Sequence, residues 1–503
     1  MRKIYLFGIV LLYMTISSCK LDINKDPNYP TDVNADKFVA SGLMWTSSAV
    51  GGDLQLMGGM WAQHYAQHAG SNQYTGIDSY NIPNSDTYVT RTWGAFYAGA
   101  LPDFKLAMEK AEAKGEWNYW MVSKIMTAYD FHILVEAYGD IPFTEALQFE
   151  TIKTPKFDNA QEVNTKIIAL LDEALTKQAE ATALSTMGKN DLVFNGDITL
   201  WTQFAKSLKL KIMMRDPNYA TVYKAPIEAL LAADDLLTTD AKITIFADKE
   251  NNSNPLFEND RRKLNTQQNI RASSTFAKFL KQNNDPRAAV YMEKAVAPDP
   301  VWGTYTGIPQ GGYTLGAAWG NKSSRARIAA TDPVYFMSAA EVSFMKAEAY
   351  VLLGNAASAK TNYELGVQSA FKRWFGEKDV TGVEVLSTNF DVTTLIGAGK
   401  VYEFNQTSNT TMLESIWRQK WVAAARSQEW EAFIETNRTG FPKAGTVNSE
   451  DPAYVPGNFA TSINSVLGAG EFPRRLIYPK TSSDYNANTP VVVPIQTKLW
   501  WQK

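Results

Sequence analysis

The sequence "AEAYVLLGNAASAKTNYELGVQSAF", residues 347–371, predicts two helices joined by a tight turn. Apolar residues recur at helical spacing and form one stripe that begins shortly before this stretch and continues into its first half: Val342, Met345, Ala349 and Leu352. Gly354 stands where the first helix should end, because glycine adopts the backbone conformation of a helix C-terminus without strain. The chain should therefore double back here as a helical hairpin.

The second helix of this hairpin carries a small-large-small pattern. Ala359, Tyr363 and Gly366 follow one another at steps of four and three, so they share one face. This spacing is typical of the second helix of a tetratricopeptide repeat, where small residues let paired helices approach closely. Another amphipathic helix is predicted at 162–175, with its apolar stripe formed by Val163, Ile167, Leu171 and Ala174.

Strand signals are weak, so we expect a mainly α-helical protein. The stretch "KITIFAD", 242–248, alternates polar and apolar residues over too short a run to found a sheet. The stretch "VVVPIQ", 491–496, is broken by Pro494, which has no N–H to donate to a sheet. Helices and loops must therefore provide most of the structure.

The start of the chain reads as an export signal. Arg2 and Lys3 precede an apolar stretch at 4–16, as in the n-region and h-region of a secretory signal. The apolar stretch is too short to span a bilayer comfortably. No later run of the sequence is long and apolar enough to predict a transmembrane helix.

The only cysteine, Cys19, follows this signal directly. A lone thiol forms neither an internal disulfide nor a zinc site. The sequence "TISSC" resembles the lipobox of bacterial lipoproteins, in which the chain is cleaved before a cysteine that is then acylated. We therefore expect 1–18 to be a lipoprotein signal peptide and 19–35 to be an acylated, extended tether. The alternative is an ordinary secretory signal with an incidental cysteine.

Composition argues for a large folded body that does not bind nucleic acid. Hydrophobic residues make up 45% of the chain and charged residues 20%. Removing residues 1–18 changes the balance from 49 bases and 52 acids to 47 and 52, a formal charge of −5. No long basic patch with interleaved aromatic residues is present, so a nucleic-acid partner is not expected.

Six motifs in a fixed order resemble the SusD/RagB family of Bacteroidetes surface lipoproteins, and the likeness covers essentially the whole chain. They are "YDFHILVEAYGDIPFTEAL" at 129–147, "LWTQFAKSLKLKIMMR" at 200–215, "NNDPR" at 283–287, "YFMSAAEVSFMKAEAYVLLG" at 335–354, "IWRQKWVAAARSQEWEAFIETNRTGFP" at 416–442 and "FPRRLIYP" at 472–479. "GDIPFTEAL" and "SLKLKIMMR" look closest to the SusD-like, nutrient-binding branch.

The resemblance implies both a fold and a task. The fold is a right-handed superhelix of tetratricopeptide-like helix pairs packed with a loop-rich second half, here one domain over 36–503. The task is to capture an oligosaccharide, or in some members a peptide, on the outer face of the outer membrane. A SusC-like TonB-dependent transporter is the implied partner. Members are not enzymes, and no cofactor is expected beyond the covalent lipid on Cys19.

A candidate ligand site lies in the loop "VWGTYTGIPQGGYTLGAAWGN", 301–321, which has six glycines and no charged residue. Sugar rings present apolar faces, so aromatic planes beside hydrogen-bonding groups suit them. The loop supplies four rings for this role: Trp302, Tyr305, Tyr313 and Trp319. The alternative is that these rings plug the core beneath a long loop, but the family's binding sites are built from such loops, which favours display.

A second candidate loop is "GSNQYTGIDSYN", 70–81, which combines rings with hydrogen-bonding side chains. Its candidate ligand contacts are Asn72, Gln73, Tyr74, Asp78 and Tyr80. The alternative is a merely solvated loop.

Other conspicuous residues are interpreted as structural. Three tryptophans lie in helical sequence and should line the core or a groove: Trp417, Trp421 and Trp430. Three arginines should pair with carboxylates or loop carbonyls: Arg438, Arg474 and Arg475. Trp500 and Trp501 are either C-terminal packing or a contact to the transporter.

Enzymatic and metal-binding alternatives lack a specific signal. His64 and His68 would share a helical face, but the glutamate of a zinc-protease motif is missing because Tyr65 follows His64. His132 lies in apolar sequence and is interpreted as a hydrogen-bonded core residue. A surface glycan hydrolase is the rival from another class, and a purely structural adhesin is a third possibility.

Overall fold

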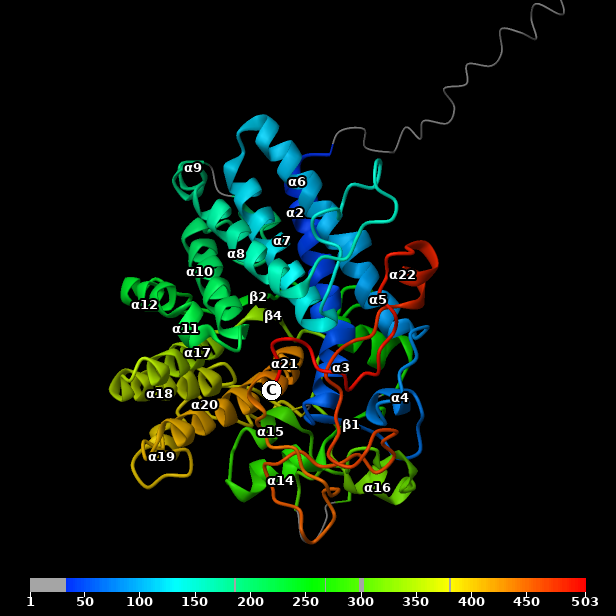
Figure 1. Cartoon of the computed structure of the whole chain (residues 1–503). Coiled ribbons are helices and arrows are strands. Elements are labelled where there is room, and N and C mark those ends of the chain that lie inside the picture. Colours follow the sequence, from blue (N-terminus) through cyan, green and yellow to red (C-terminus); the bar gives the residue numbers. More distant parts are fainter. Residues whose placement is uncertain (1–32, 185–186, 267, 298–302, 380) are drawn as a thin grey trace, which may run out of the picture.

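The computed structural model describes residues 33–184, 187–266, 268–297, 303–379 and 381–503. Helices dominate it, and the strands are short (Figure 1). Cys19 and Trp302 lie outside the described residues. The tether predicted for 19–35 also falls almost wholly outside them.

The hairpin predicted at 347–371 is present as α17 (Ala339–Leu352) and α18 (Ala356–Lys372). A Cβ added to Gly366 would lie 2.6 Å from the ring of Phe344, so only glycine permits this close approach. Ala359 and Tyr363 are buried on the same face, as the small-large-small pattern predicts. Leu352 is an exception, because it is 36% exposed at the end of its helix.

The N-terminal half forms a layer of long helices. A continuous helical run begins with α2 (Ala35–Ser48), passes through the π-helical turn η2 (Ala49–Asp53) and ends with α3 (Leu54–Trp61). A second run joins α5 (Thr87–Gly94), η3 (Ala95–Ala100) and α6 (Leu101–Lys114). The neighbouring long helices are α7 (Trp117–Tyr138), α8 (Ala160–Leu175) and α10 (Ile198–Arg215). In α8 the predicted stripe is buried throughout.

Two further helices connect this layer to the rest of the molecule. They are α20 (Asn409–Ala424), which packs on α17, and α21 (Glu429–Thr439), which packs on α3. The shorter helices are α4 (Thr75–Asp78), α9 (Gln178–Thr182), α11 (Tyr219–Val222), α12 (Lys224–Ala233), α13 (Pro255–Phe257), α14 (Ser274–Gln282), α15 (Ala288–Tyr291), α16 (Ala317–Lys322), α19 (Thr393–Ile396) and α22 (Lys480–Tyr485). The remaining helical turns are η4 (Gly188–Asn190), η5 (Glu258–Lys263) and η6 (Gly312–Thr314).

Sheet structure in the described residues amounts to two antiparallel pairs. Strand β1 (Tyr65–Gln67) pairs with β3 (Ile270–Ala272) so that Ala66 faces Arg271. Strand β2 (Ala241–Ile243) pairs with β4 (Val334–Met337) so that Lys242 faces Tyr335. The stretch at 242–248 thus contributes only the end of a short strand, and the stretch at 491–496 contributes none.

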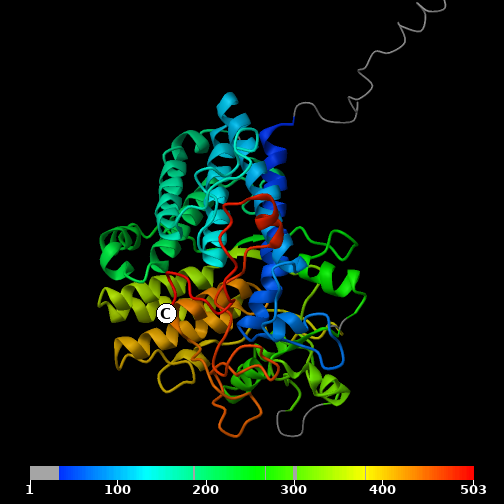
Figure 2. The ribbon, with the colours of Figure 1, turned by 45° about the vertical axis from the view of Figure 1, so that its right-hand side comes forward.

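The loop-rich parts of the chain gather on one side of the helices. The described parts of 255–330, together with 440–500, lie below and beside the long helices in both views (Figures 1 and 2). One hydrophobic core extends through both parts, from Ala35 in the first helix to Trp501 near the C-terminus. Trp501 therefore packs within the core, and Trp500 is partly buried against the same core.

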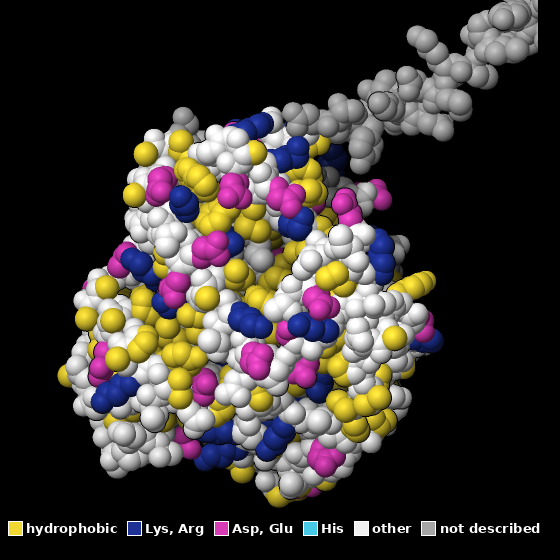
Figure 3. Space-filling view, turned by 45° about the horizontal axis from the view of Figure 1, so that its top comes forward, with side chains coloured by type: hydrophobic (Ala, Val, Ile, Leu, Met, Phe, Trp, Pro, Cys, Tyr) yellow, Lys and Arg dark blue, Asp and Glu magenta, His cyan; other side chains and the backbone are white. Residues whose placement is uncertain are grey.

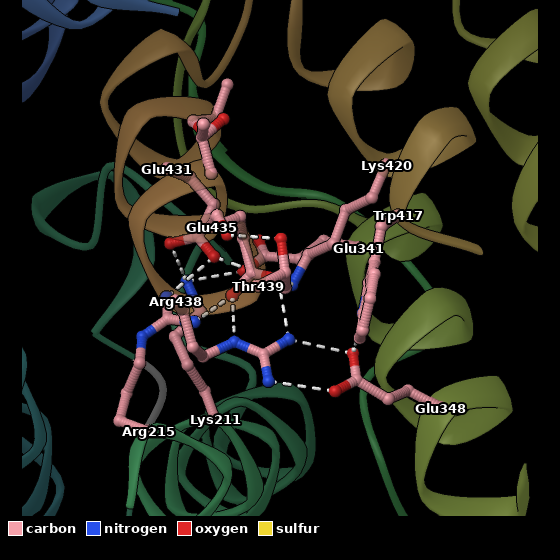
Figure 4. A network of polar contacts seen from close by, with 12 residues as sticks. Lys211, Arg215, Glu341, Glu348, Trp417, Lys420, Glu431, Glu435, Arg438 and Thr439 are labelled. Atoms are coloured by element: carbon pink, nitrogen blue, oxygen red, sulfur yellow. Dashed lines mark hydrogen bonds and ion pairs between the residues drawn. The ribbon is translucent and has the colours of Figure 1, made fainter. Parts of the chain in front are cut away.

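A buried network of charges links the helices (Figure 4). Arg438 forms a paired contact with Glu348, with both guanidinium nitrogens 2.8 Å from its carboxylate oxygens, and also contacts Glu435. Lys211 lies 2.5 Å from Glu341 and 3.0 Å from Glu431. The network is completed by Arg215, Glu136 and Lys420. The interpretation of Arg438 as structural is thus confirmed.

The other residues interpreted as structural are also buried or paired. Trp421 and Trp430 belong to the core, and the indole N–H of Trp417 donates to Glu348 over 3.0 Å. Arg475 donates to the carbonyl of Tyr138. Arg474 donates to Asn437 over 3.1 Å and to the carbonyl of Lys503 over 3.4 Å, instead of facing a ligand.

On the face in Figure 3, Lys and Arg side chains are interspersed with Asp and Glu side chains. In the described part of the chain, none of the helices has the length and apolar character needed to cross a membrane.

Candidate functional site

The two predicted ligand loops meet at a buried carboxylate, Asp78. Its oxygens accept hydrogen bonds from the backbone N–H of Gly311 over 3.0 Å and from the side-chain amide of Gln310 over 2.9 Å. It also accepts from the backbone N–H of Gln67 over 3.1 Å. Asp78 therefore fixes the loop at 301–321 against the loop at 70–81. Figure 1 shows α4 and α16, which belong to these two loops, on the same side of the molecule as β1.

Backbone hydrogen bonds hold the described part of the 301–321 loop to β3 and to the first residue of α14. The N–H of Ile308 donates to the carbonyl of Ala272 over 2.9 Å, and the N–H of Ser274 donates to the carbonyl of Ile308 over 2.8 Å. Next to the loop, Ser324 donates its N–H to the carbonyl of Thr306 over 2.7 Å. These bonds pre-organise the loop, which lowers the entropy lost when a ligand binds.

Two glycines of this loop are required by close contacts. Gly311 has a φ of +68°, and a Cβ there would lie 2.3 Å from the hydroxyl of Ser462. A Cβ on Gly320 would lie 2.3 Å from the imidazole Nε2 of His68. The glycine content that predicted a loop thus also permits tight packing between segments.

A third segment, 461–467, joins the two predicted loops and was not singled out from the sequence. Asn464 donates its side-chain amide to the carbonyl of Gly311 over 2.6 Å and to the hydroxyl of Thr314 over 2.9 Å. Ser462 donates to the carbonyl of Asp78 over 2.8 Å. We call the surface formed by 70–73, 303–322 and 461–467 the loop face. Segment 461–467 is rich in serine, threonine and asparagine, which was the available signal, but it contains no aromatic residue.

The described aromatic rings of the loop are half-buried. Trp319 packs on a small apolar cluster formed by Ala66, Ala69 and Ile308. Tyr305 packs instead on the main core, and Tyr313 lies in η6. The loop therefore combines both expected roles, since each ring is partly docked and partly displayed. Tyr305 and Trp319 thus rest on two different apolar clusters.

The candidates at 70–81 separate into two groups. Asn72 and Gln73 are exposed and lie on the loop face. Tyr74, Asp78 and Tyr80 are at most 3% exposed and are not available to a ligand. Tyr74 donates its hydroxyl to Asp260 over 2.8 Å. These three side chains hold the loop in place, so their expected role as direct contacts does not fit this structure.

The electrostatics of Asp78 follow from its burial. Removal from water raises the pKa of Asp78 to about 7, although the N–H donors of Gln67 and Gly311 act in the opposite direction. Burial also raises the pKa of Tyr80, whose hydroxyl lies near this carboxylate. The loop face therefore has a titratable group beneath it, while half-buried rings and the exposed amides of Asn72 and Gln73 lie at its surface.

The histidines do not form the expected helical pair. Helix α3 ends at Trp61, and a short strand at 65–67 separates His64 from His68. A ring nitrogen of His64 lies 3.1 Å from the carbonyl of Trp421, and burial lowers the pKa of this imidazole to about 3. In the described ranges, no group of three or more His, Cys, Asp and Glu side chains is arranged to hold a metal ion.

Several glutamates with shifted pKa values lie in the buried charge network, away from the loop face. Burial opposes ionisation of Glu431, but Arg215, Lys211 and Lys420 outweigh it and lower its pKa to about 2. His132 lies in the same region, with its Nε2 3.1 Å from Glu136. The charged side chains of this network pair with one another, so their shifted pKa values reflect structural pairing.

Comparison with known families identifies one model that spans most of the chain. A SusD-like family described as "Starch-binding associating with outer membrane" matches residues 54–479. No protein among the curated sequences matches the chain significantly.

Solved structures share the fold. A SusD homologue from Bacteroides uniformis has a TM-score of 0.72 at 24% identity, covering 94% of this chain and 100% of its own. A SusD homologue from Bacteroides fragilis has a TM-score of 0.69 at 20% identity, covering 94% of this chain and 100% of its own. A SusD homologue from Flavobacterium johnsoniae, described as chitin-binding, has a TM-score of 0.71 at 20% identity, with coverages of 92% and 98%.

Proposed function

The chain belongs to the SusD/RagB family, and from this premise we propose that it is a surface lipoprotein that captures an oligosaccharide and delivers it to a SusC-like TonB-dependent transporter. The family is described as starch-binding and associated with the outer membrane. A relative with the same fold is described as chitin-binding, which supports a glycan as the ligand. A peptide is the alternative ligand.

The observation that carries the proposal is the joining of three separate segments into the loop face by Asp78. The half-buried Trp319 has an apolar support beneath it and contributes a ring for a pyranose face. Asn72 and Gln73 are exposed amides that can bind the hydroxyl groups of a sugar. Binding, orientation and release are the chemistry that these groups supply, and no covalent step is required.

Titration calorimetry tests the ligand class. The mature chain, 20–503, would be titrated with neutral oligosaccharides, acidic oligosaccharides and short peptides. We expect saturable binding of at least one oligosaccharide. If only peptides bind, the ligand is a peptide and not an oligosaccharide. If shortened oligosaccharides are released during incubation, the protein is a glycan hydrolase.

The contribution of the loop ring is tested by Trp319→Ala. We expect oligosaccharide affinity to fall by about 1–3 kcal/mol, because a stacking surface is lost. Trp45→Ala is the matched control, since Trp45 is 46% exposed on α2 and should not affect affinity. The same test applies to Trp302→Ala, whose position lies outside the described residues. Unchanged affinity in both loop variants would indicate that the rings only close the core.

The lipid anchor is tested by Cys19→Ala in cells. We expect the variant to leave the membrane fraction, because the acylated sulfur would be absent. The measurement is immunoblotting of membrane and soluble fractions beside the wild type. An unchanged distribution would overturn the proposed anchor without affecting the glycan-binding proposal.

A further inference from the structure

A concave pocket lies away from the loop face, between α5 with η3, the loop 142–155 and α22. Its volume is about 370 Å³, which falls within the range of about 300–1,000 Å³ typical of small-molecule sites. Figure 1 shows α5 and α22 side by side at this position. The pocket is separate from the residues proposed to bind the oligosaccharide.

Segments far apart in the sequence hold the walls together. Asn486 donates its side-chain amide to the carbonyl of Pro155 over 2.7 Å, which joins the end of α22 to the loop. Tyr97 donates its hydroxyl to the carbonyl of Pro142 over 2.7 Å, which joins η3 to the same loop. The walls are thus fixed by specific hydrogen bonds, as expected for a built cavity.

Aromatic side chains form the floor and the rim. Trp93 and Tyr97 lie four residues apart with ring centroids 4.5 Å apart, and both line the pocket. Trp93 also meets Tyr138 edge-on at 5.0 Å, which fixes its orientation. At the rim, Phe149 is 50% exposed and Tyr485 is 81% exposed. Large rings left in water beside an apolar cavity indicate a site for an apolar group.

Most polar side chains of the lining, including Lys153, already have hydrogen-bond partners within the protein. Besides Tyr97 and Asn486, Gln148 donates its amide to the carbonyl of Thr144 over 3.0 Å. Ser482 exchanges a hydrogen bond with Thr489 over 2.9 Å, and Glu145 accepts from the N–H of Lys156 over 2.8 Å. A sugar ring inserted here would bury hydroxyl groups with few free partners, which is costly. A ring without hydroxyl groups avoids that cost.

We propose that this pocket is a second binding site, which takes a compact, neutral molecule with a flat apolar ring. The side chains of aromatic amino acids belong to this chemical class, whereas free sugars do not. Aromatic rings at the floor and rim provide edge-on and offset contacts to such a ligand. Its occupancy does not depend on the oligosaccharide site.

Gly94 permits a clean test, because it lines the pocket and a Cβ there would meet no atom within 4 Å. Its φ of −63° is open to any side chain. Gly94→Leu should fill the cavity, whereas Gly94→Ala adds only a methyl group and is the matched control. Thermal melting of both variants checks that they fold as the wild type does.

The probe is N-acetyl-tryptophanamide. Its binding is measured by ligand-observed NMR, and cellobiose is added as a competitor. We expect the probe to bind the wild type and Gly94→Ala with similar affinity. Its affinity for Gly94→Leu should be at least tenfold lower. Cellobiose should not displace it. If Gly94→Leu does not fold, Tyr485→Ala at the exposed rim takes its place and should weaken binding at least threefold. Equal binding to the filled variant, displacement by cellobiose, or no binding to the wild type would each overturn the proposal.

Discussion

At the scale of single residues, Asp78 has the most consequential position in the chain. Its residue type and its loop suggested a ligand contact, yet its carboxylate is fully buried and accepts from Gln67, Gln310 and Gly311. Sequence could not show this, because the donors come from positions up to 233 residues away. Asn72 and Gln73 in the same loop are exposed, and nothing in the local pattern distinguishes the two groups.

The buried Asp78 predicts a pH dependence of stability. Its folded pKa of about 7 lies above the usual value of 3.8, so the folded state binds a proton that the unfolded state has lost. This contribution is present at low pH and decreases as pH rises from about 4 to about 7. Relative to Asp78→Asn, the free energy of unfolding of the wild type should fall by about 1–3 kcal/mol between pH 5 and pH 7.

Urea denaturation followed by tryptophan fluorescence measures this difference at each pH. The Asn variant is less stable overall, because its amide group faces N–H donors, but it does not titrate. Parallel pH profiles for the two proteins would mean that Asp78 is ionised throughout and that its hydrogen bonds outweigh its burial.

At the scale of elements, the hairpin of α17 and α18 was predictable because its determinants are local. The turn glycine, the apolar stripe and the small-large-small face all lie within about 30 residues. The exposed Leu352 shows the limit of this reasoning, since a helical stripe does not indicate where the neighbouring helix ends. The pairing of β1 with β3 was not predicted, because strands of three residues give no periodic signal.

The contact between these two helices predicts a specific sensitivity. Gly366→Ala should destabilise the protein by about 1–3 kcal/mol, because the added methyl group overlaps the buried ring of Phe344. Gly94→Ala is the matched control in another helix, where nothing lies within 4 Å. There the substitution should be neutral or stabilise by about 0.5–1 kcal/mol.

Thermal and chemical unfolding measure the stability of the two alanine variants relative to the wild type. Equal stability of the two would contradict the close approach of α17 and α18, and with it the physical reason for glycine at this face.

At the scale of the whole molecule, the charge network connects helices that are distant in sequence. Arg438 on α21 binds Glu348 on α17, and Arg215 on α10 binds Glu431 on α21. From the sequence, the arginine motif indicated structural pairing but not its partners, since charged residues are too numerous to pair by inspection. The family resemblance supplied the fold, which the match over 54–479 and the solved relatives confirm.

Breaking this network should be costly. Arg438→Ala leaves Glu348 and Glu435 buried with fewer counter-charges, so we expect a loss of about 3–5 kcal/mol. Lys105→Ala removes an exposed pair with Glu109 on α6 and should change stability by no more than about 0.5 kcal/mol. Equal effects in chemical denaturation would show that the buried pairs contribute no more than surface ones.

The composition of the proposed binding surface was predicted in part. The loop at 301–321 and two residues at 70–73 lie on the loop face, but 461–467 was missed because it carries no ring. The pocket beside α22 was also missed, although Trp93 and Tyr97 have the spacing of one helical face. Surfaces assembled from distant loops depend on the tertiary fold, which local patterns do not encode.

The most direct test of the central claim is hydrogen exchange with and without a bound oligosaccharide from the titration panel, resolved by mass spectrometry. If the loop face binds the ligand, we expect slower exchange in 70–81, 303–322 and 461–467, with little change in α17 and α18. Protection confined to 142–155 and 480–486, or to the long helices, with none at the loop face, would contradict it.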